Sequence, residues 1–349
     1  MDLQEDQPAI HKPVLKYYNH PHLFHLENGE GIENLKIAYT TFGNLNEDQS
    51  NVVWVCHALT ANSDPSEWWP GLVGYKDAIN PDKYFIVCAN IIGSCYGSTC
   101  PSSENPKTGK SYGIDFPLVT IKDMANAHQL LFEHLGLKKI KLLIGGSMGG
   151  QQAMEWNISH PDQVEKLVLL ATNARHSAWG IAFNAAQRMA LEADSDFLQN
   201  NPSNDKAGLM AARAVAMLSY RSPQIYNERQ TDSDSRIQDY GVEKYQRYQG
   251  QKLADRFDAY SYYALSKSMD THNVARGRNS FESALSTIKS QTLVIGISSD
   301  GLFIPEEQKF TSDRIPDSKI EFVESIYGHD GFLVEAKKIS ELIIKHLKI

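Results

Sequence analysis

Short apolar runs rich in β-branched residues alternate with helical patterns along the first half of the chain. Between these runs, residues 121–135 have the spacing of an amphipathic helix that stops at Gly136, a residue type common at helix ends. The runs that indicate buried strands cover residues 35–42, 52–57, 84–90, 140–144 and 164–171. This alternation predicts an α/β fold with a mostly parallel central sheet and helices on both faces.

The alternation breaks near Asn173. From there to about Thr287 the pattern predicts helices joined by polar connectors, the latter over residues 200–205 and 230–235. Strands return over residues 292–297 and 319–323, and a last helix is predicted over 332–347. We therefore predict three parts, which are a first core segment over residues 1–173, a helical cap inserted over 174–287 and a second core segment over 288–349.

A glycine-rich turn separates a predicted strand from a helical pattern. Residues 145–150 read Gly-Gly-Ser-Met-Gly-Gly and directly follow the apolar run 141–144. Gly-x-Ser-x-Gly between a strand and a helix is typical of a nucleophile elbow, which exposes a serine hydroxyl above the sheet. The neighbours must be small because larger side chains would collide with the adjacent strand or helix. We predict Ser147 as the nucleophile; the alternative is a glycine-rich turn that happens to contain serine.

A serine hydroxyl needs a base to take its proton, and the base needs an acid to orient it. With such an elbow the partners follow in the order serine, acid, histidine. His329 follows the last predicted strand and a turn, whereas we expect His346, at the end of the final helix, to be solvated. Asp300 directly follows the strand 292–297. We predict His329 as the base and Asp300 as its orienting acid; the alternative for Asp300 is a turn former or helix cap.

Two backbone N–H groups are predicted to stabilise an oxyanion above Ser147. Met148 follows the nucleophile and supplies the first. We assign the second to Leu59, in the loop after the strand 52–57, with Thr60 as the near alternative. His57, at the end of that strand, is interpreted as a structural histidine.

Composition narrows the classes of function. A chain of 349 residues with a net charge of −8 is not expected to bind nucleic acid as its main partner. No apolar run approaches the ~20 residues of a membrane span. The acidic start of the chain lacks the apolar stretch of a secretory signal, and the four cysteines lack the spacing of a metal site. We expect a cytoplasmic protein with no bound metal and no membrane association.

Several sequence blocks resemble the homoserine O-acetyltransferase family, which belongs to the α/β-hydrolase superfamily. Besides the elbow, these blocks are residues 57–60, 90–99, 101–106, 248–250, 256–259, 299–303 and 328–333. They extend from the first strands almost to the end of the chain, and a plain esterase is not expected to share the two that lie in the cap.

The resemblance implies an α/β-hydrolase fold with a cap, and an enzyme that moves the acetyl group of acetyl-CoA to the side-chain hydroxyl of L-homoserine in methionine biosynthesis. By the same resemblance the cycle is ping-pong through an acetylated Ser147, with no permanently bound cofactor, in a homodimer formed through the cap helices. Arg213 matches the family's carboxylate-binding arginine, and Asp330 matches its amine-binding acid. A surface arginine and a loop-forming aspartate are the alternatives. Weaker candidates for anion binding are Arg221, Arg276 and Arg278.

Some positions depart from the family's pattern. They are Ser94, Cys100, Asn273 and Gly301. Gly301 directly follows Asp300 and therefore bears on acyl or acceptor preference more than on the type of reaction. Open alternatives are serine as the acceptor, a succinyl donor, an esterase or thioesterase that uses the same triad, and a catalytically silent binding protein. The tyrosines of the cap, at positions 240, 245, 248, 260, 262 and 263, either pack together or line a pantetheine tunnel.

Overall fold

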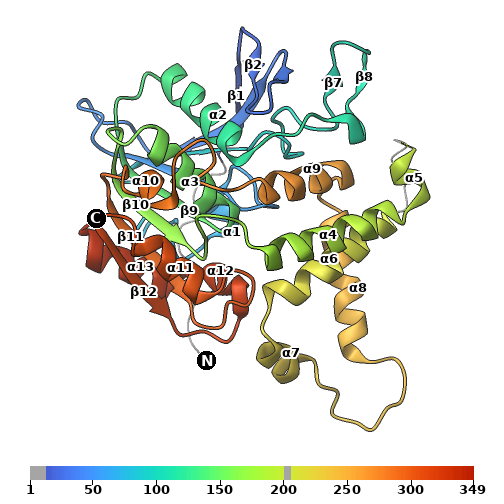
Figure 1. The fold of residues 1–349 in the computed structure, drawn as a ribbon. Helices are drawn as coiled ribbons and strands as arrows, with labels where there is room; N and C mark the ends of the chain where they lie inside the picture. Colours follow the sequence, from blue (N-terminus) through green and yellow to red (C-terminus); the bar gives the residue numbers. More distant parts are fainter. Residues whose placement is uncertain (1–12, 200–205) are drawn as a thin grey trace.

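A twisted eight-stranded sheet forms the centre of the molecule (Figure 1). The computed structural model describes residues 13–199 and 206–349, so the connector predicted over 200–205 lies outside the described residues. In chain order the strands of the sheet are β1 (Lys16–Asn19), β4 (Lys36–Phe42), β5 (Val52–Cys56), β6 (Phe85–Ala89), β9 (Ile140–Gly146), β10 (Val164–Leu170), β11 (Gln291–Ile297) and β12 (Ser318–Val323).

The strands lie in the spatial order β1-β4-β6-β5-β9-β10-β11-β12. The pairs from β6 to β12 are parallel, whereas β4 pairs antiparallel with both β1 and β6. The predicted mostly parallel sheet is confirmed. Small two-stranded sheets are separate from the central sheet. They are formed by β2 (Phe24–His25) with β3 (Gly31–Ile32) and by β7 (Glu104–Asn105) with β8 (Lys110–Ser111).

The central strands are apolar throughout because both faces of the sheet are covered. Along β5, Trp54 points into one buried cluster while Val53 and Val55 point into the other. Trp54 meets Trp156 of α3 edge to face, with ring centroids 4.8 Å apart. The helices whose apolar residues join the first cluster include α2 (Ile121–His134) and α3 (Met148–Ser159), and α13 (Ala336–Leu347) joins the second.

A helical insertion connects β10 to β11, and most of its helices lie to one side of the sheet (Figure 1). Its helices are α4 (Ala178–Glu192), α5 (Ser195–Leu198), α6 (Ala207–Tyr220), α7 (Pro223–Gln230), α8 (Gly241–Ala254), α9 (Ala259–Asp270) and α10 (Phe281–Leu285). Helix α6 packs between α4 and α8. The domain boundaries at residues 174 and 287 stay a prediction.

Several short helical segments and one edge strand differ from the expected pattern. The predicted last helix is interrupted at Glu335, whose ψ of 26° is not helical, and so divides into α12 (Gly331–Val334) and α13. Strand β1 escaped prediction because its side chains are mostly exposed and show no apolar alternation. The remaining short helices are α1 (Pro65–Trp68), α11 (Pro305–Ser312), η1 (Gly113–Asp115) and η2 (Gly328–Asp330). Among the described residues no helix combines the length and apolar character needed to cross a membrane.

Candidate active site

The predicted elbow is a sharp turn between β9 and α3. Ser147 has φ 56° and ψ −125°, a conformation that costs a non-glycine residue about 1–3 kcal/mol and persists only where the surroundings impose it. The surroundings are crowded. A Cβ on Gly145 would lie 2.2 Å from the Gly149 carbonyl oxygen, and a Cβ on Gly149 would lie 2.1 Å from the Cys56 carbonyl oxygen. The strand and helix therefore approach each other as the motif predicts, and Ser147 sits at the carboxyl end of β9.

Ser147, His329 and Asp300 form a continuous hydrogen-bonded chain. The Ser147 Oγ lies 2.9 Å from His329 Nε2, and His329 Nδ1 lies 2.7 Å from Asp300 Oδ2. The three residues are 7%, 3% and 3% exposed, so bulk water scarcely competes for these bonds. The structure thus brings together all three residues of the predicted triad.

The surroundings of Asp300 determine the tautomer of His329. An ionised carboxylate only accepts hydrogen bonds, so Nδ1 of the imidazole must carry its proton and Nε2 is left to accept from the Ser147 hydroxyl. The other oxygen, Oδ1, accepts from the backbone N–H groups of Leu302 and Phe303, both at 2.9 Å. These two bonds fix the carboxylate, and the Phe303 ring stacks on the imidazole with centroids 4.9 Å apart. The base is therefore held both in its tautomer and in its orientation.

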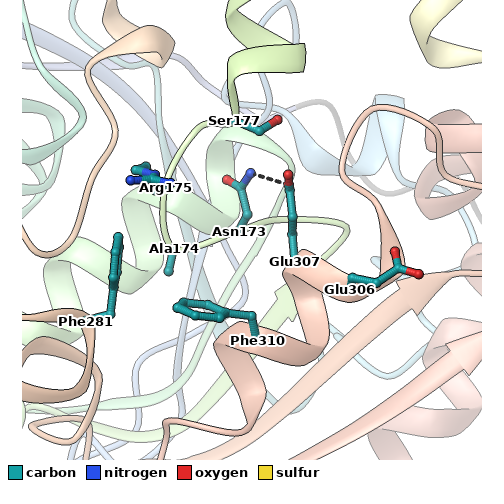
Figure 2. A pocket seen from close by; sticks show the side chains of 8 residues that line it. All are labelled: Asn173, Ala174, Arg175, Ser177, Phe281, Glu306, Glu307 and Phe310. Atoms are coloured by element: carbon teal, nitrogen blue, oxygen red, sulfur yellow. Dashed lines mark hydrogen bonds between the residues drawn. The ribbon is translucent and has the colours of Figure 1, made fainter.

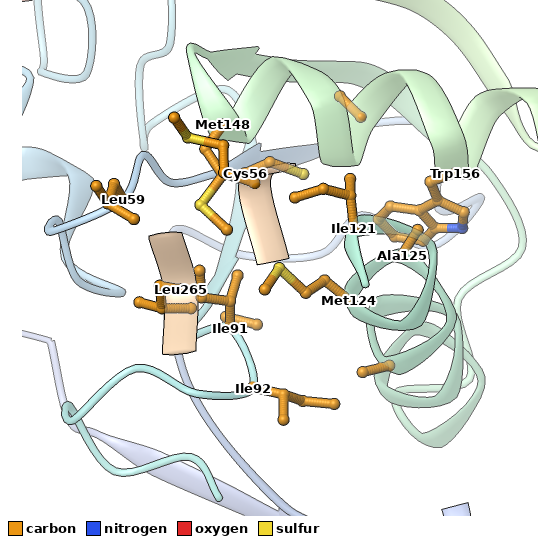
Figure 3. Close-up of a cluster of buried hydrophobic side chains, with 14 of the residues drawn as sticks. Cys56, Leu59, Ile91, Ile92, Ile121, Met124, Ala125, Met148, Trp156 and Leu265 are labelled. Carbon is orange, nitrogen blue, oxygen red and sulfur yellow. The ribbon is translucent and has the colours of Figure 1, made fainter. Parts of the chain in front are cut away.

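The two predicted oxyanion donors lie on segments that a shared apolar cluster supports. Figure 3 shows the side chains of Leu59 and Met148 among buried apolar residues, with Leu265 of α9 on the insertion side. Neither backbone N–H has a hydrogen-bond partner within residues 13–199 and 206–349. Free donors at these positions are what an oxyanion would require. Leu59 stays the predicted second donor, with Thr60 beside it.

His57 is fully buried and bonds to the backbone on both sides. Its Nδ1 lies 2.8 Å from the Ala58 carbonyl oxygen, and its Nε2 accepts from the Ile91 N–H at 3.1 Å. Burial lowers the pKa of His57 to about 4, so the ring is neutral near neutral pH. These contacts anchor the start of the loop that carries Leu59, in line with its interpretation as a structural histidine.

A second group of charges lies beside the triad. Asp330 directly follows His329, and Arg221 of the insertion contacts it with Nε 3.2 Å from Oδ2. Burial raises the pKa of Asp330, while the nearby charges of Arg213 and Arg221 oppose that rise. The structure therefore places Asp330 next to the base and Arg213 close enough to act on the charge of Asp330, and it adds Arg221 to them.

Arg213 retains hydrogen-bonding capacity. Its guanidinium carbon lies 5.1 Å from the centroid of the Tyr220 ring, and its Nε is buried without a hydrogen-bond partner in the described part of the chain. A buried donor without a partner costs about 1–3 kcal/mol. The Nε of Arg213 is therefore available to a partner, as its predicted role in carboxylate binding requires.

The cap tyrosines do not behave as one group. Tyr260 and Tyr262 are buried, and the Tyr262 hydroxyl donates to Gln187 at 2.6 Å. Tyr240 and Tyr248 are exposed. Tyr245 lies beneath the Arg221 guanidinium, 6.0 Å from ring centroid to carbon. Packing therefore accounts for Tyr260 and Tyr262, which agrees with the first of the two alternatives for these tyrosines.

Other candidate residues lie in different surroundings. Arg276 pairs with Glu27 and Arg278 pairs with Glu155, each at 2.9 Å, so both weaker candidates for anion binding have partners of their own. The prediction that His346 is solvated is wrong, because its side chain is only 11% exposed and contacts Glu321 at 2.9 Å. Gly301 borders open space, and its carbonyl accepts from the Trp179 indole N–H at 2.7 Å.

A separate cavity of about 270 Å³ lies beside α11 (Figure 2). Phe281 and Phe310 form one side, and Asn173 donates to Glu307 at 2.8 Å on the other. Burial raises the pKa of Glu307. None of the predicted site residues lines this cavity. Elsewhere, no cluster of three or more His, Cys, Asp or Glu suited to a metal ion occurs among the described residues, and the absence of a metal stays a prediction.

Comparison with known proteins identifies first the class and then the family. The family profile described as "alpha/beta hydrolase fold" matches residues 51–336. A homoserine O-acetyltransferase from Cyclobacterium marinum is 46% identical over 91% of each chain. The solved homoserine O-acetyltransferase of Staphylococcus aureus is 30% identical, with a TM-score of 0.81 over 97% of this chain and 96% of that one. The chain belongs to the homoserine O-acetyltransferase family.

A solved acetylester hydrolase from Corynebacterium glutamicum has a similar structure, with 24% identity and a TM-score of 0.82 over 96% of each chain. This likeness concerns the fold alone. The predicted α/β-hydrolase fold, the family and the class of acyltransferase enzymes are confirmed by these comparisons.

Proposed function

We propose that this protein transfers the acetyl group of acetyl-CoA to the side-chain hydroxyl of L-homoserine through an acetylated Ser147, as a step of methionine biosynthesis. The observation that carries the proposal is the arrangement of Arg213 and Asp330 beside the base. A hydrolase that uses water has no need for an arginine whose buried Nε has no partner among the described residues, nor for a carboxylate next to its histidine.

In the first half-reaction, Ser147 Oγ attacks the thioester carbonyl while His329 Nε2 takes its proton. Asp300 stabilises the imidazolium that forms and does not itself take the proton. The N–H groups of Leu59 and Met148 donate to the oxyanion, and each such donor is typically worth ~10²–10³ in rate. The bond from the acyl carbon to sulfur then breaks, CoA leaves as the thiol with the proton from His329, and Ser147 carries the acetyl ester.

In the second half-reaction the acceptor amino acid occupies the space that CoA has left. Its carboxylate pairs with Arg213, whose planar guanidinium group can grip two oxygens at once. Its ammonium group pairs with Asp330. These two contacts point the side-chain hydroxyl at the ester. His329 takes its proton as the oxygen attacks the acyl carbon, and then gives that proton to Ser147 Oγ as the bond from Oγ to the acyl carbon breaks, which releases the acetylated amino acid and the free serine.

Both charged groups of the acceptor therefore have a partner of opposite charge. Serine is one methylene shorter than homoserine, and one methylene alone typically changes specificity only ~10–200-fold. A succinyl donor would bring a further carboxylate. With Arg213 assigned to the acceptor and Arg221 paired with Asp330, we favour the acetyl donor.

A matrix of donors and acceptors tests the proposal. Acetyl-CoA and succinyl-CoA are each combined with L-homoserine, L-serine or water, and release of free thiol is followed. We expect fast release only with acetyl-CoA and homoserine together. Equal release with water alone would instead assign a thioesterase, and a preference for serine or succinyl-CoA would change the substrate.

We further propose a homodimer and a cytoplasmic location. The insertion exposes large apolar side chains, among them Met189 of α4 and Leu218 of α6, which are 67% and 58% exposed. Exposed apolar groups of this kind are common where two chains associate. Sedimentation at micromolar concentration tests the dimer, and a monomer would contradict it.

A further inference from the structure

The cap motif at residues 256–259 has no role in the chemistry described so far, yet its arginine reaches the core. Arg256 lies between α8 and α9 of the insertion. Its Nη1 donates to the Thr60 carbonyl oxygen at 2.6 Å and to the Tyr96 hydroxyl at 2.7 Å. Thr60 directly follows Leu59, the predicted oxyanion donor, so this contact joins the insertion to the oxyanion loop.

The backbone that carries Arg256 is itself well fixed. The N–H groups of Arg256 and Phe257 both donate to the Leu253 carbonyl, at 3.0 and 2.9 Å. The buried Phe257 ring meets the Tyr96 ring edge to face, with centroids 5.6 Å apart. Arg256 and both of its acceptors therefore belong to one packed unit, although the guanidinium group itself is exposed.

The loop that carries Leu59 is held at two points, one on either side. On the inner side His57 bonds to Ala58 and Ile91. Within the loop the Ala61 N–H closes a turn onto the Ala58 carbonyl at 3.0 Å. On the outer side the Thr60 carbonyl accepts from Arg256. The Leu59 N–H lies between these anchors and has no hydrogen-bond partner in the part of the chain that the structure describes.

We infer that Arg256 is a positioning residue, which holds the Leu59 N–H in place to receive the oxyanion. The inference rests on the proposed serine chemistry but not on homoserine as the acceptor. Oxyanion stabilisation depends on donors that are fixed before the charge develops, because a donor that must reorganise loses most of its benefit. Loss of the clamp should therefore lower the rate of every step that passes through a tetrahedral oxyanion.

An exposed guanidinium group has an obvious rival role, which is contact with a phosphate of CoA. The two roles differ in what they affect. A positioning residue acts on acylation by any acetyl donor and on deacylation alike, mainly through kcat. A phosphate contact acts only on donors that contain CoA, mainly through KM.

The experiment compares Arg256→Ala, Arg256→Lys and Tyr96→Phe with the wild type, using acetyl-CoA and p-nitrophenyl acetate as donors. The matched control is Arg247→Ala on α8, which removes an arginine of the same insertion. Its side chain is 74% exposed and, within residues 13–199 and 206–349, pairs only with Glu243. Pre-steady-state release of thiol or p-nitrophenolate reports acylation, and discharge of the acetyl-enzyme reports deacylation.

We expect Arg256→Ala to slow both half-reactions, with either donor, by roughly ten- to a hundredfold, less than outright loss of an oxyanion donor. KM should change by no more than about twofold. Arg256→Lys should show a smaller loss because an ammonium group can still reach one acceptor, and Tyr96→Phe a smaller loss because the Thr60 contact remains. Arg247→Ala should match the wild type.

A loss confined to acetyl-CoA would overturn the inference and assign Arg256 to CoA binding. Wild-type rates in all three variants would overturn it as well. If Arg256→Ala does not fold, Arg256→Lys and Tyr96→Phe decide the question by the same readouts, with melting temperature as the check. Failure of the proposed function would give a different result. The wild type would then show no release of thiol that depends on homoserine, whereas the burst of p-nitrophenolate from p-nitrophenyl acetate would still compare the variants.

Discussion

Replacement of Asp300 by asparagine is the sharpest perturbation of the candidate triad. The two side chains have the same shape, so packing around the site should survive. What changes is hydrogen-bonding character, because the amide presents one acceptor and one donor where the carboxylate presents two acceptors. The outcome depends on which end of the amide faces His329.

The structure determines that choice. The position of Oδ1 receives two backbone donors, from Leu302 and Phe303. Turning the amide NH₂ toward them would leave two buried N–H groups unpaired, at about 1–3 kcal/mol each. Asparagine therefore keeps its oxygen there and turns NH₂ toward His329, whose Nδ1 must then accept. The imidazole proton moves to Nε2, which can no longer take the proton of Ser147.

We expect kcat to fall by ~10⁴, which corresponds to about 5 kcal/mol of activation free energy. The assay is thiol release from acetyl-CoA in the presence of homoserine, together with proton NMR of the imidazole Nδ1–H, whose signal should disappear. Asp313→Asn, which alters an exposed aspartate that pairs with Lys309 on the neighbouring helix α11, is the control. A loss below tenfold with an unchanged melting temperature would refute the assignment of Asp300.

Two further predictions follow from other parts of the molecule. Arg213→Lys should raise the KM for homoserine about 10–100-fold and leave the KM for acetyl-CoA unchanged, because an ammonium group cannot bind a carboxylate in the bidentate way. Steady-state kinetics with each substrate varied in turn measures both KM values. An unchanged KM for homoserine would remove Arg213 from the site. The free energy of unfolding should fall on acidification from about pH 6.5 to about pH 4, by up to about 5 kcal/mol per pH unit. In this range four histidines bind protons in the unfolded chain but stay neutral where they are buried in the folded protein. Urea denaturation across that range measures the slope, and a flat profile contradicts the burial of these rings. Burial lowers the pKa of His57, His128 and His176 to about 4, and that of His272 to about 3.

The parts of the site that the sequence predicted are those with a local signature. The elbow at residues 145–150 occupies consecutive positions, and its geometry follows from the lack of side chains on Gly145 and Gly149. Asp300 and His329 could be found because each follows a recognisable strand. The parallel sheet could be predicted because strands buried on both faces are continuous apolar runs.

The contacts between the insertion and the core had no such signature. Arg256 and Thr60 are 196 positions apart, and Arg221 and Asp330 are 109 apart. No periodicity connects such pairs, because they are joined only by the packing of α6 and the α8–α9 connection against the core. The edge strand β1 was missed for a different reason, since an exposed strand pairs through its backbone and leaves no apolar alternation in its side chains.

The central claim is that Ser147 carries the acetyl group between donor and acceptor. Mass spectrometry of the protein after rapid mixing with acetyl-CoA, followed by peptide mapping, tests it most directly. We expect one acetyl group, located on Ser147, which disappears when L-homoserine is added and is absent from Ser147→Ala. An unmodified Ser147 in an enzyme that nevertheless acetylates homoserine, or an acetyl group on another residue that homoserine discharges, would contradict it.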